Sequence, residues 1–427
     1  MTRLIGRLAI AVALLVATPF LHAQTQPSSS PLTLEDLQRQ LQELQQAHAD
    51  ELDELREQIE ELEQRLAEAA QKTATVQPQS ANVFNPRVTA FGNFIGRFDN
   101  QQIALAEGAR IDDRFNLREV EIDLRAAIDP WADGFLIVAV ESEIPNEFVT
   151  GIEEGYLVLK KLPLLNTAPL GLKLKAGRYR PEFGRFNKIH LHDLPHTSYP
   201  RALQTFLGEE GFLQNGLSAQ FFLPSPGASN TLEATIDVLN GGNIPIAAEN
   251  ASDHLAGLAH VKWFWDLASG HDLELGASGY WGKAGGEDGL RSKLYGVDLT
   301  YKWRPKTHGE WHSFLIGGEL YWTSINVPDD SQPQRRPLGF YAWSQYQFNR
   351  RTYLGVRAEM TEALTGAKLQ TQAYAAFLSY YTTEFLRLRL GFEHVESEVA
   401  YDGLNSAFLE INFVFGSHPT EPYWVNR

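Results

Sequence analysis

The sequence predicts an all-β transmembrane barrel of about 16 antiparallel strands, preceded by an N-terminal α-helical coiled coil. Three observations predict this fold class. Apolar residues recur every three or four positions over residues 33–72, but from residue 84 onward they alternate with polar residues at a period of two. The alternating segments are about 10 residues long, enough for a tilted strand to cross a bilayer. Aromatic residues such as Trp263 and Trp265 lie near segment ends, where a membrane interface would be.

Residues 1–23 have the features of a secretory signal peptide. Arg3 and Arg7 precede the apolar residues 8–16, and the small residue Ala23 offers a cleavage site. The chain contains no cysteine, so neither disulfides nor thiol chemistry can act in an oxidising compartment. After residue 23, no stretch reaches the roughly 18 consecutive apolar residues of a spanning helix. A membrane protein with this sequence would therefore cross with strands.

Residues 33–72 are predicted to form a periplasmic coiled coil between two linkers, residues 24–32 and 73–82. Four leucines carry the heptad spacing at its start: Leu34, Leu37, Leu41 and Leu44. The segment has 12 acidic against 4 basic residues and supplies −8 of the formal net charge of −16, which argues against a nucleic-acid partner. An apolar stripe exposed to water favours self-association, here into a homotrimer. A solvated helix without a partner and a helix that binds cell wall are the alternatives.

Residues 83–415 are predicted to form the barrel, with outer-membrane lipid around it. Candidate strands begin near residues 83, 115, 134, 151, 170, 214, 231, 253, 271, 290, 309, 336, 351, 371, 384 and 404. An even number of strands places both ends in the periplasm, where residues 416–427 would form a C-terminal tail. The connectors alternate between mostly long and mostly short, as outer loops and periplasmic turns do. A soluble β-sandwich also has apolar strand faces, but the export signal and the segment lengths favour a barrel.

The third long connector, residues 181–213, is 33 residues long and is predicted to fold into the barrel and narrow a pore. It carries three Arg or Lys against four Asp or Glu, so its charge alone does not predict a strong anion filter. Only a helix and linkers precede the barrel, which leaves no plug domain and predicts passive diffusion. The candidate constriction and lumen residues are Arg178, Arg180, Arg185, Lys188, Arg201, Lys173, Lys175, Arg387, Arg389, Glu209 and Glu210.

Three histidines in this connector, His190, His192 and His196, are weak candidates for binding a divalent metal together with Asp193. Their spacing is not a strong metal signature, and hydrated or loop-packing histidines are the alternative. No Ser, His and carboxylate set stands out, so the chain is not predicted to be an enzyme and no catalytic residue or cofactor is assigned.

Four motifs resemble one porin family. They are Arg-Glu-Val-Glu-Ile-Asp-Leu at 118–124, Val-Leu-Lys at 158–160, Lys-Ala-Gly-Arg-Tyr-Arg-Pro-Glu-Phe-Gly at 175–184 and Gly-Glu-Glu-Gly at 208–211. The segment 84–224 is similar to the phosphate-selective porin O and P type. That resemblance implies a trimeric 16-stranded outer-membrane porin, sometimes with anion preference. The selective members have lumens rich in lysine and arginine, whereas residues 181–213 are balanced in sign.

Taken together, the sequence predicts a porin in the outer membrane of a Gram-negative-type bacterium, through which small hydrophilic solutes or ions diffuse passively. A phosphate- or oxyanion-selective porin is the first alternative. The second is an envelope-tethering protein that holds the cell wall through the coiled coil and uses the barrel as an anchor.

Overall fold

The structure is a computed structural model. It describes residues 86–416, except residues 105–109, 112, 143, 163, 165, 226, 228, 248–253, 284–290, 327–333, 365–366 and 401–402. It also describes Gln42 and Gln46, which are helical and exposed. The predicted signal peptide, both linkers, the rest of the predicted coiled coil and residues 417–427 lie outside the described residues. The chain divides into two compact units, Met1–Ser80 and Ala81–Arg427, and the second contains the whole barrel.

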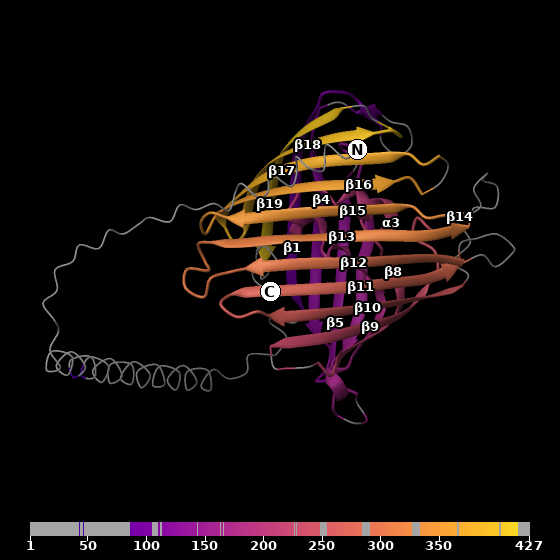
Figure 1. Cartoon of the computed structure of the whole chain (residues 1–427), viewed down its shortest axis with the longest axis vertical. Coiled ribbons are helices and arrows are strands. Elements are labelled where there is room, and N and C mark those ends of the chain that lie inside the picture. Colours follow the sequence, from indigo (N-terminus) through magenta and orange to yellow (C-terminus); the bar gives the residue numbers. More distant parts are fainter. Residues whose placement is uncertain are drawn as a thin grey trace, which may run out of the picture. The chain divides into compact units, whose positions relative to one another are not determined.

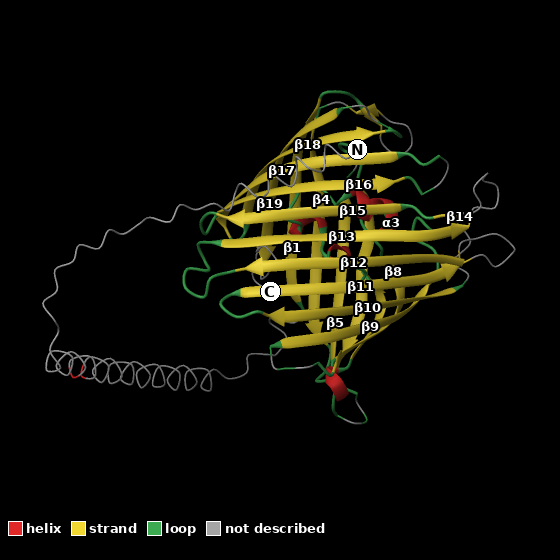
Figure 2. Ribbon diagram, viewed as in Figure 1, coloured by secondary structure: helices red, strands yellow, loops and turns green. Residues whose placement is uncertain are grey.

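Sixteen antiparallel strands close into a barrel (Figures 1 and 2), which confirms the predicted strand number. They are β1 (Arg87–Asp99), β4 (Arg114–Ala127), β5 (Ala132–Glu141), β6 (Val149–Leu159), β7 (Lys173–Tyr179), β8 (Gln214–Leu223), β9 (Asn230–Asn240), β10 (Leu255–Asp266), β11 (His271–Lys283), β12 (Arg291–Trp303), β13 (Ser313–Asn326), β15 (Leu338–Gln347), β16 (Thr352–Glu362), β17 (Gln370–Thr383), β18 (Leu386–Ser397) and β19 (Leu404–Gly416). Closure occurs at β1, where Ala90 pairs with Phe415 of β19 on one side and with Ile122 of β4 on the other.

The connectors between the barrel strands contain several short elements. The two-residue strands β2 (Ile103–Ala104) and β3 (Arg110–Ile111) pair with each other, and β14 (Gln334–Arg335) extends the sheet beside β13. The 3-10 helix η2 (Pro169–Gly171) precedes β7. None of the helices in the described part of the chain is long and apolar enough to span a membrane.

Alternation places apolar side chains on the outside of the barrel and polar ones inside. Along β18, Leu388 and Leu390 are exposed on the outer face, whereas Arg387 and Arg389 are buried within the lumen. Many other outer-face residues are large, apolar and exposed, among them Leu136, Ile152, Leu217, Ile236, Val261, Leu275, Val297, Ile316, Leu354 and Leu378. Such a surface would be unfavourable in water and suits contact with lipid tails.

The connector at residues 181–213 lies inside the barrel, and we call it the lumen loop. It contains η3 (Phe186–Lys188), η4 (Leu191–Asp193) and α3 (Arg201–Leu207), and α3 packs against β13, β15 and β16 (Figure 1). Gly339 allows this close approach, since a Cβ there would lie 2.6 Å from the Phe206 ring.

The core of the molecule forms between the lumen loop and one half of the barrel wall. Fully buried loop residues, Phe183, Phe186, Leu203, Phe206 and Phe212, pack in one cluster with wall residues that include Tyr280, Tyr321, Tyr341 and Trp343. The apolar cluster therefore lies mainly along β9 to β17, where it adjoins buried charges such as Glu319 and Arg357. The inner face of β4 carries the buried charges Glu119 and Glu121.

Candidate functional site

Four arginines of the barrel wall hold the backbone of the lumen loop. Arg387 Nη2 donates to the His192 carbonyl at 2.8 Å, and Arg389 Nη2 donates to the Leu194 carbonyl at 2.7 Å. Arg118 and Arg357 donate in the same way to the carbonyls of Thr197 and Ser198, at 2.6 and 2.8 Å. This part of the loop has little regular secondary structure, so these bonds satisfy buried carbonyls that would otherwise lack donors.

The same arginines are paired with wall carboxylates. Glu410 accepts bonds from Arg387 at 2.8 Å and from Arg389 at 3.0 Å. Glu393 accepts bonds from Arg357 at 3.0 Å and from Arg201 of the loop at 2.8 Å. Of the predicted lumen residues, Arg387 and Arg389 thus lie in the lumen, but both are buried and engaged in holding the loop.

Glu319 of β13 anchors the start of the loop. Its carboxylate accepts hydrogen bonds from the backbone N–H groups of Arg185 at 3.0 Å and Phe186 at 2.9 Å, and from the Tyr321 and Tyr341 hydroxyls. Gly184 has a φ of +64°, and a Cβ there would meet Glu319 Oε2 at 1.9 Å. Only glycine therefore fits this turn beside the carboxylate.

The predicted loop cations Arg185 and Lys188 are also paired. Arg185 Nη1 lies 2.5 Å from Glu274 of β11, and Lys188 Nζ lies 3.4 Å from Glu182. Burial alone would raise the pKa of Glu182, but the ammonium groups of Lys188 and Lys262 lower it to about 2. Arg185 and Lys188 are thus each neutralised by a neighbouring carboxylate.

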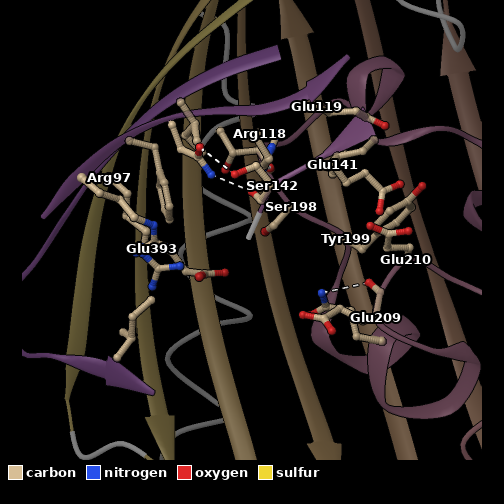
Figure 3. Close-up of a pocket in the computed structure, with 18 of the residues that line it drawn as sticks. Arg97, Arg118, Glu119, Glu141, Ser142, Ser198, Tyr199, Glu209, Glu210 and Glu393 are labelled. Atoms are coloured by element: carbon tan, nitrogen blue, oxygen red, sulfur yellow. Dashed lines mark hydrogen bonds between the residues drawn. The ribbon is translucent and has the colours of Figure 1, made fainter. Parts of the chain in front are cut away.

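A cavity of about 350 Å³ opens on the side of the long connectors, and we call it the loop-side cavity. Its charged lining residues are Arg97, Arg114, Arg118, Glu119, Glu141, Arg201, Glu209, Glu210 and Glu393. Figure 3 shows Glu119, Glu141 and Glu210 close together on one side, with Arg97 and Glu393 on the other. Burial raises the pKa of Glu210, and nearby Glu153 adds to this.

A second cavity, of about 460 Å³, lies on the side of the short connectors, and we call it the turn-side cavity. Its charged lining residues are Asp133, Lys160, Lys173, Lys175, Arg180, Glu182 and Asp237. Lys175 Nζ lies 4.8 Å from the Tyr156 ring centroid and 4.9 Å from that of Tyr179, within the range of cation–π attraction. This cavity holds the predicted residues Lys173, Lys175 and Arg180.

Between the two cavities lies a buried group of charges, which we call the ionic junction: Glu119, Glu121, Glu153, Arg180 and His190. Arg180 lines the turn-side cavity, and its guanidinium donates to Glu153 and to the Glu210 carbonyl. His190 Nδ1 lies 3.0 Å from Glu121 and 3.3 Å from Glu153. Burial would lower the pKa of His190, but these two carboxylates more than offset that effect and hold it well above its usual value.

The three histidines do not converge on one point. His190 and His192 both face Glu121, but His196 Nδ1 lies 2.9 Å from the Ser198 carbonyl, and its ring packs against Phe186 and Phe377. In the described part of the chain, His196 belongs to no group of three side chains that could hold a metal ion. Burial, with Arg357 nearby, lowers the pKa of His196 well below its usual value. His196 is therefore a packing residue.

Arg178 differs from the other predicted lumen residues. Along β7, Lys173, Lys175 and Tyr179 point into the lumen, so Arg178 lies on the opposite face of the strand. There its Nε donates to the Ile152 carbonyl at 3.0 Å. Arg178 is therefore not a lumen residue.

Several residues of the site were not singled out from the sequence, namely Arg118, Glu153, Tyr199, Glu274 and Glu319. Glu153 and Glu154 both point inward because the register between β5 and β6 shifts between Ile137 and Val138. In the sequence, such a bulge is indicated by two adjacent acidic residues in a segment that otherwise alternates.

Comparisons with known proteins identify solved structures with a similar fold. No family model matches the chain. A protein of uncharacterised function from Aquifex aeolicus (strain VF5) is 26% identical over 353 residues, which cover 72% of this chain and 70% of that protein. The outer membrane channel DcaP of Acinetobacter baumannii has a TM-score of 0.52 at 8% identity, covering 77% of this chain and 97% of that one. An anion-selective porin from Comamonas acidovorans has a TM-score of 0.50 at 11% identity, covering 77% and 100%. At such identities the likeness to solved structures establishes a shared fold.

Proposed function

We propose that this chain is an outer-membrane porin through which small hydrophilic solutes and ions diffuse passively, in a lumen narrowed by the lumen loop. The observation that carries the proposal is the pair of polar cavities on either side of the ionic junction, inside a closed barrel with an apolar exterior. An apolar outer face with a polar interior is the pattern of outer-membrane channels.

The proposed path follows the wall of β4 to β9, whose side chains line the two cavities. On the other side of the lumen, the apolar cluster packs between the loop and the wall of β10 to β17. Cavities of about 350 and 460 Å³ each hold several water molecules, since one water occupies about 30 Å³ in the liquid. A hydrated solute would therefore pass between the loop and the wall of β4 to β9, beside Glu119, Glu121 and Arg180.

Mixed charge along this path favours weak ion selectivity. The loop-side cavity has four arginines against five glutamates, and the turn-side cavity has four Lys or Arg against three Asp or Glu. Rings of one sign would be needed for a strong filter. Because Arg387 and Arg389 are occupied by Glu410 and loop carbonyls, they are poor candidates for binding a passing anion.

A phosphate- or oxyanion-selective porin remains the alternative, and the lysines of the turn-side cavity favour it. Lys160, Lys173 and Lys175 form the most basic part of the proposed path. The reversal potential across a planar bilayer under a KCl gradient separates the two functions, with a Lys173→Gln, Lys175→Gln variant as comparison. We expect a small reversal potential. A strongly anion-selective value that the double variant abolishes would establish the alternative, and a cation-selective value would eliminate it.

The porin function itself is tested by reconstitution. Purified protein should give stepwise conductance in planar bilayers and admit small sugars in liposome swelling, and absence of both would refute a porin. Gln204→Trp adds bulk to the loop-side cavity and should lower single-channel conductance, because Gln204 lines that cavity. Val297→Trp adds the same bulk to the exposed outer face of β12 and should leave conductance unchanged.

We also propose that the protein is a homotrimer, with residues 33–72 as a periplasmic coiled coil. The leucine spacing supports the coiled coil, and the alternative is attachment to the cell wall through the same segment. Deletion of residues 33–72 distinguishes these roles. Conductance should persist in the deletion, and mass photometry in detergent reports whether trimers remain. Loss of envelope attachment with intact trimers would favour the tether.

A further inference from the structure

Beyond the proposed pore, the lumen loop contains a histidine, His192, that has close neighbours on every side except at one ring nitrogen. His192 is 2% exposed, and its ring stacks on Phe91 with centroids 4.0 Å apart and planes at 21°. Its carbonyl oxygen accepts bonds from Arg387 at 2.8 Å and Asn412 at 3.0 Å. Its Nε2 lies 3.7 Å from the Asp193 carboxylate. The residue is therefore held by stacking of its ring and by hydrogen bonds to its backbone, with a carboxylate near Nε2.

The remaining ring nitrogen faces two carboxylates. His192 Nδ1 is buried without a hydrogen-bond partner and lies 3.5 Å from Glu121 Oε2. Glu119 Oε2 is likewise buried without a hydrogen-bond partner. These three side chains each offer one ligand atom, and the three atoms all lie within 4.8 Å of one another. Burying polar atoms without hydrogen-bond partners costs free energy. The convergence of these three side chains therefore indicates a site that binds a ligand.

We propose that Glu119, Glu121 and His192 bind a divalent transition-metal ion such as Zn²⁺ within the barrel. Zn²⁺ takes nitrogen and oxygen ligands at about 2.0–2.2 Å, and two such ligands at a tetrahedral angle lie about 3.4 Å apart. The 3.5 Å between His192 Nδ1 and Glu121 Oε2 matches this spacing. A carboxylate that accepts a hydrogen bond from the other nitrogen is the usual support for a metal-binding histidine, and Asp193, 3.7 Å from Nε2, is the carboxylate nearest to that position.

The chemistry of the donors selects the class of ion. One imidazole with two carboxylates suits Zn²⁺ and other first-row divalent ions, whereas Ca²⁺ prefers six to eight oxygen ligands. An ion can reach the site through the loop-side cavity, which Glu119 lines. The ion would link the lumen loop, through His192, to β4, through the two glutamates. It would also place positive charge in the ionic junction.

Metal content is the direct test. The purified full-length protein is freed of metal with a chelator, dialysed against buffered Zn²⁺ and analysed for bound zinc. We expect about one zinc per chain, and a loss of at least tenfold in affinity in His192→Phe and Glu121→Gln. His196→Gln is the matched control, because His196 lies in the same loop and faces away from the site. It should bind zinc as the unaltered protein does.

Other results would overturn the assignment. Zinc content near zero in the unaltered protein, or equal binding by all variants, refutes the site. If His190→Gln abolishes binding and His192→Phe does not, the ion belongs to the neighbouring group of Glu121, Glu153 and His190 instead. Should the variants fail to fold, Co²⁺ absorption of the unaltered protein still decides. The proposal requires a nitrogen- and oxygen-ligand spectrum that Zn²⁺ displaces and Ca²⁺ does not.

Discussion

Glu319→Ala should release the start of the lumen loop from the barrel wall. The Glu319 carboxylate is the acceptor for the backbone N–H groups of Arg185 and Phe186. A hydrogen bond to a charged group contributes about 1.5–3 kcal/mol, so losing both costs about 3–6 kcal/mol of local docking energy. Since about 1.4 kcal/mol corresponds to a factor of ten, these two amides should exchange hydrogen about 100-fold faster or more. The four wall arginines still hold residues 192–198, so this part of the loop should stay in place.

Hydrogen exchange followed by mass spectrometry, in detergent, measures this effect on the peptide that contains Arg185 and Phe186. Glu319→Gln keeps one acceptor oxygen and should show a smaller increase. Asp272→Ala is the matched control, because it removes a lumen carboxylate that pairs with Lys302 at 2.8 Å and not with the loop. An exchange rate within threefold of the unaltered protein in Glu319→Ala would refute the anchoring role of this carboxylate.

Gly184→Ala should destabilise the loop start by about 1–3 kcal/mol, because a residue with a side chain is strained at a φ of +64°, and exchange of the same peptide reports it. Arg389→Met removes a partner of buried Glu410 and the donor to the Leu194 carbonyl, so it should lower the free energy of unfolding in urea by about 3–5 kcal/mol. Arg350→Met removes one partner of an exposed ion pair and should lower it by less than about 1 kcal/mol. Burial, with Arg357 and Arg389 nearby, depresses the pKa of His196, so below the ordinary histidine pKa of about 6.5 the unfolded chain gains a proton that the folded loop does not. Stability should therefore fall with decreasing pH by up to about 1.4 kcal/mol per pH unit, and a similar slope in His196→Gln would contradict this.

Most strands of the barrel could be predicted from the sequence because the alternation of apolar and polar residues along a strand is a local pattern. The charges of β18 face the lumen as their alternation with Leu388 and Leu390 predicts, and strand number depends only on counting such segments. The largest errors in strand starts are four residues, at residue 83 against Arg87 and residue 309 against Ser313. Both predicted starts fall in connectors, where the sequence has no periodic pattern that would mark the first residue of the strand.

The partners of the site residues could not be predicted in this way. Contacts such as Glu319 with Arg185, or Arg387 with His192, join residues more than 100 positions apart through the path of one irregular loop. The sequence therefore indicated Arg387 and Arg389 as lumen charges, but not that loop carbonyls occupy them. Likewise His190, His192 and Asp193 were identified together, while the carboxylates of Glu121 and Glu153 that face the histidines came from strands of the wall.

In the proposed function, solutes pass between the lumen loop and the wall of β4 to β9, while the apolar cluster seals the other side of the loop. The chain has no cysteine, so single cysteines can report access to a charged thiol reagent without background. Gln204→Cys and Gln220→Cys place a thiol in the loop-side and turn-side cavities, and Leu203→Cys places one on the sealed side of α3. During single-channel recording, the reagent should change the conductance of the first two variants and leave Leu203→Cys unaffected. Rapid modification of Leu203→Cys with no response from the two cavity positions would contradict the account.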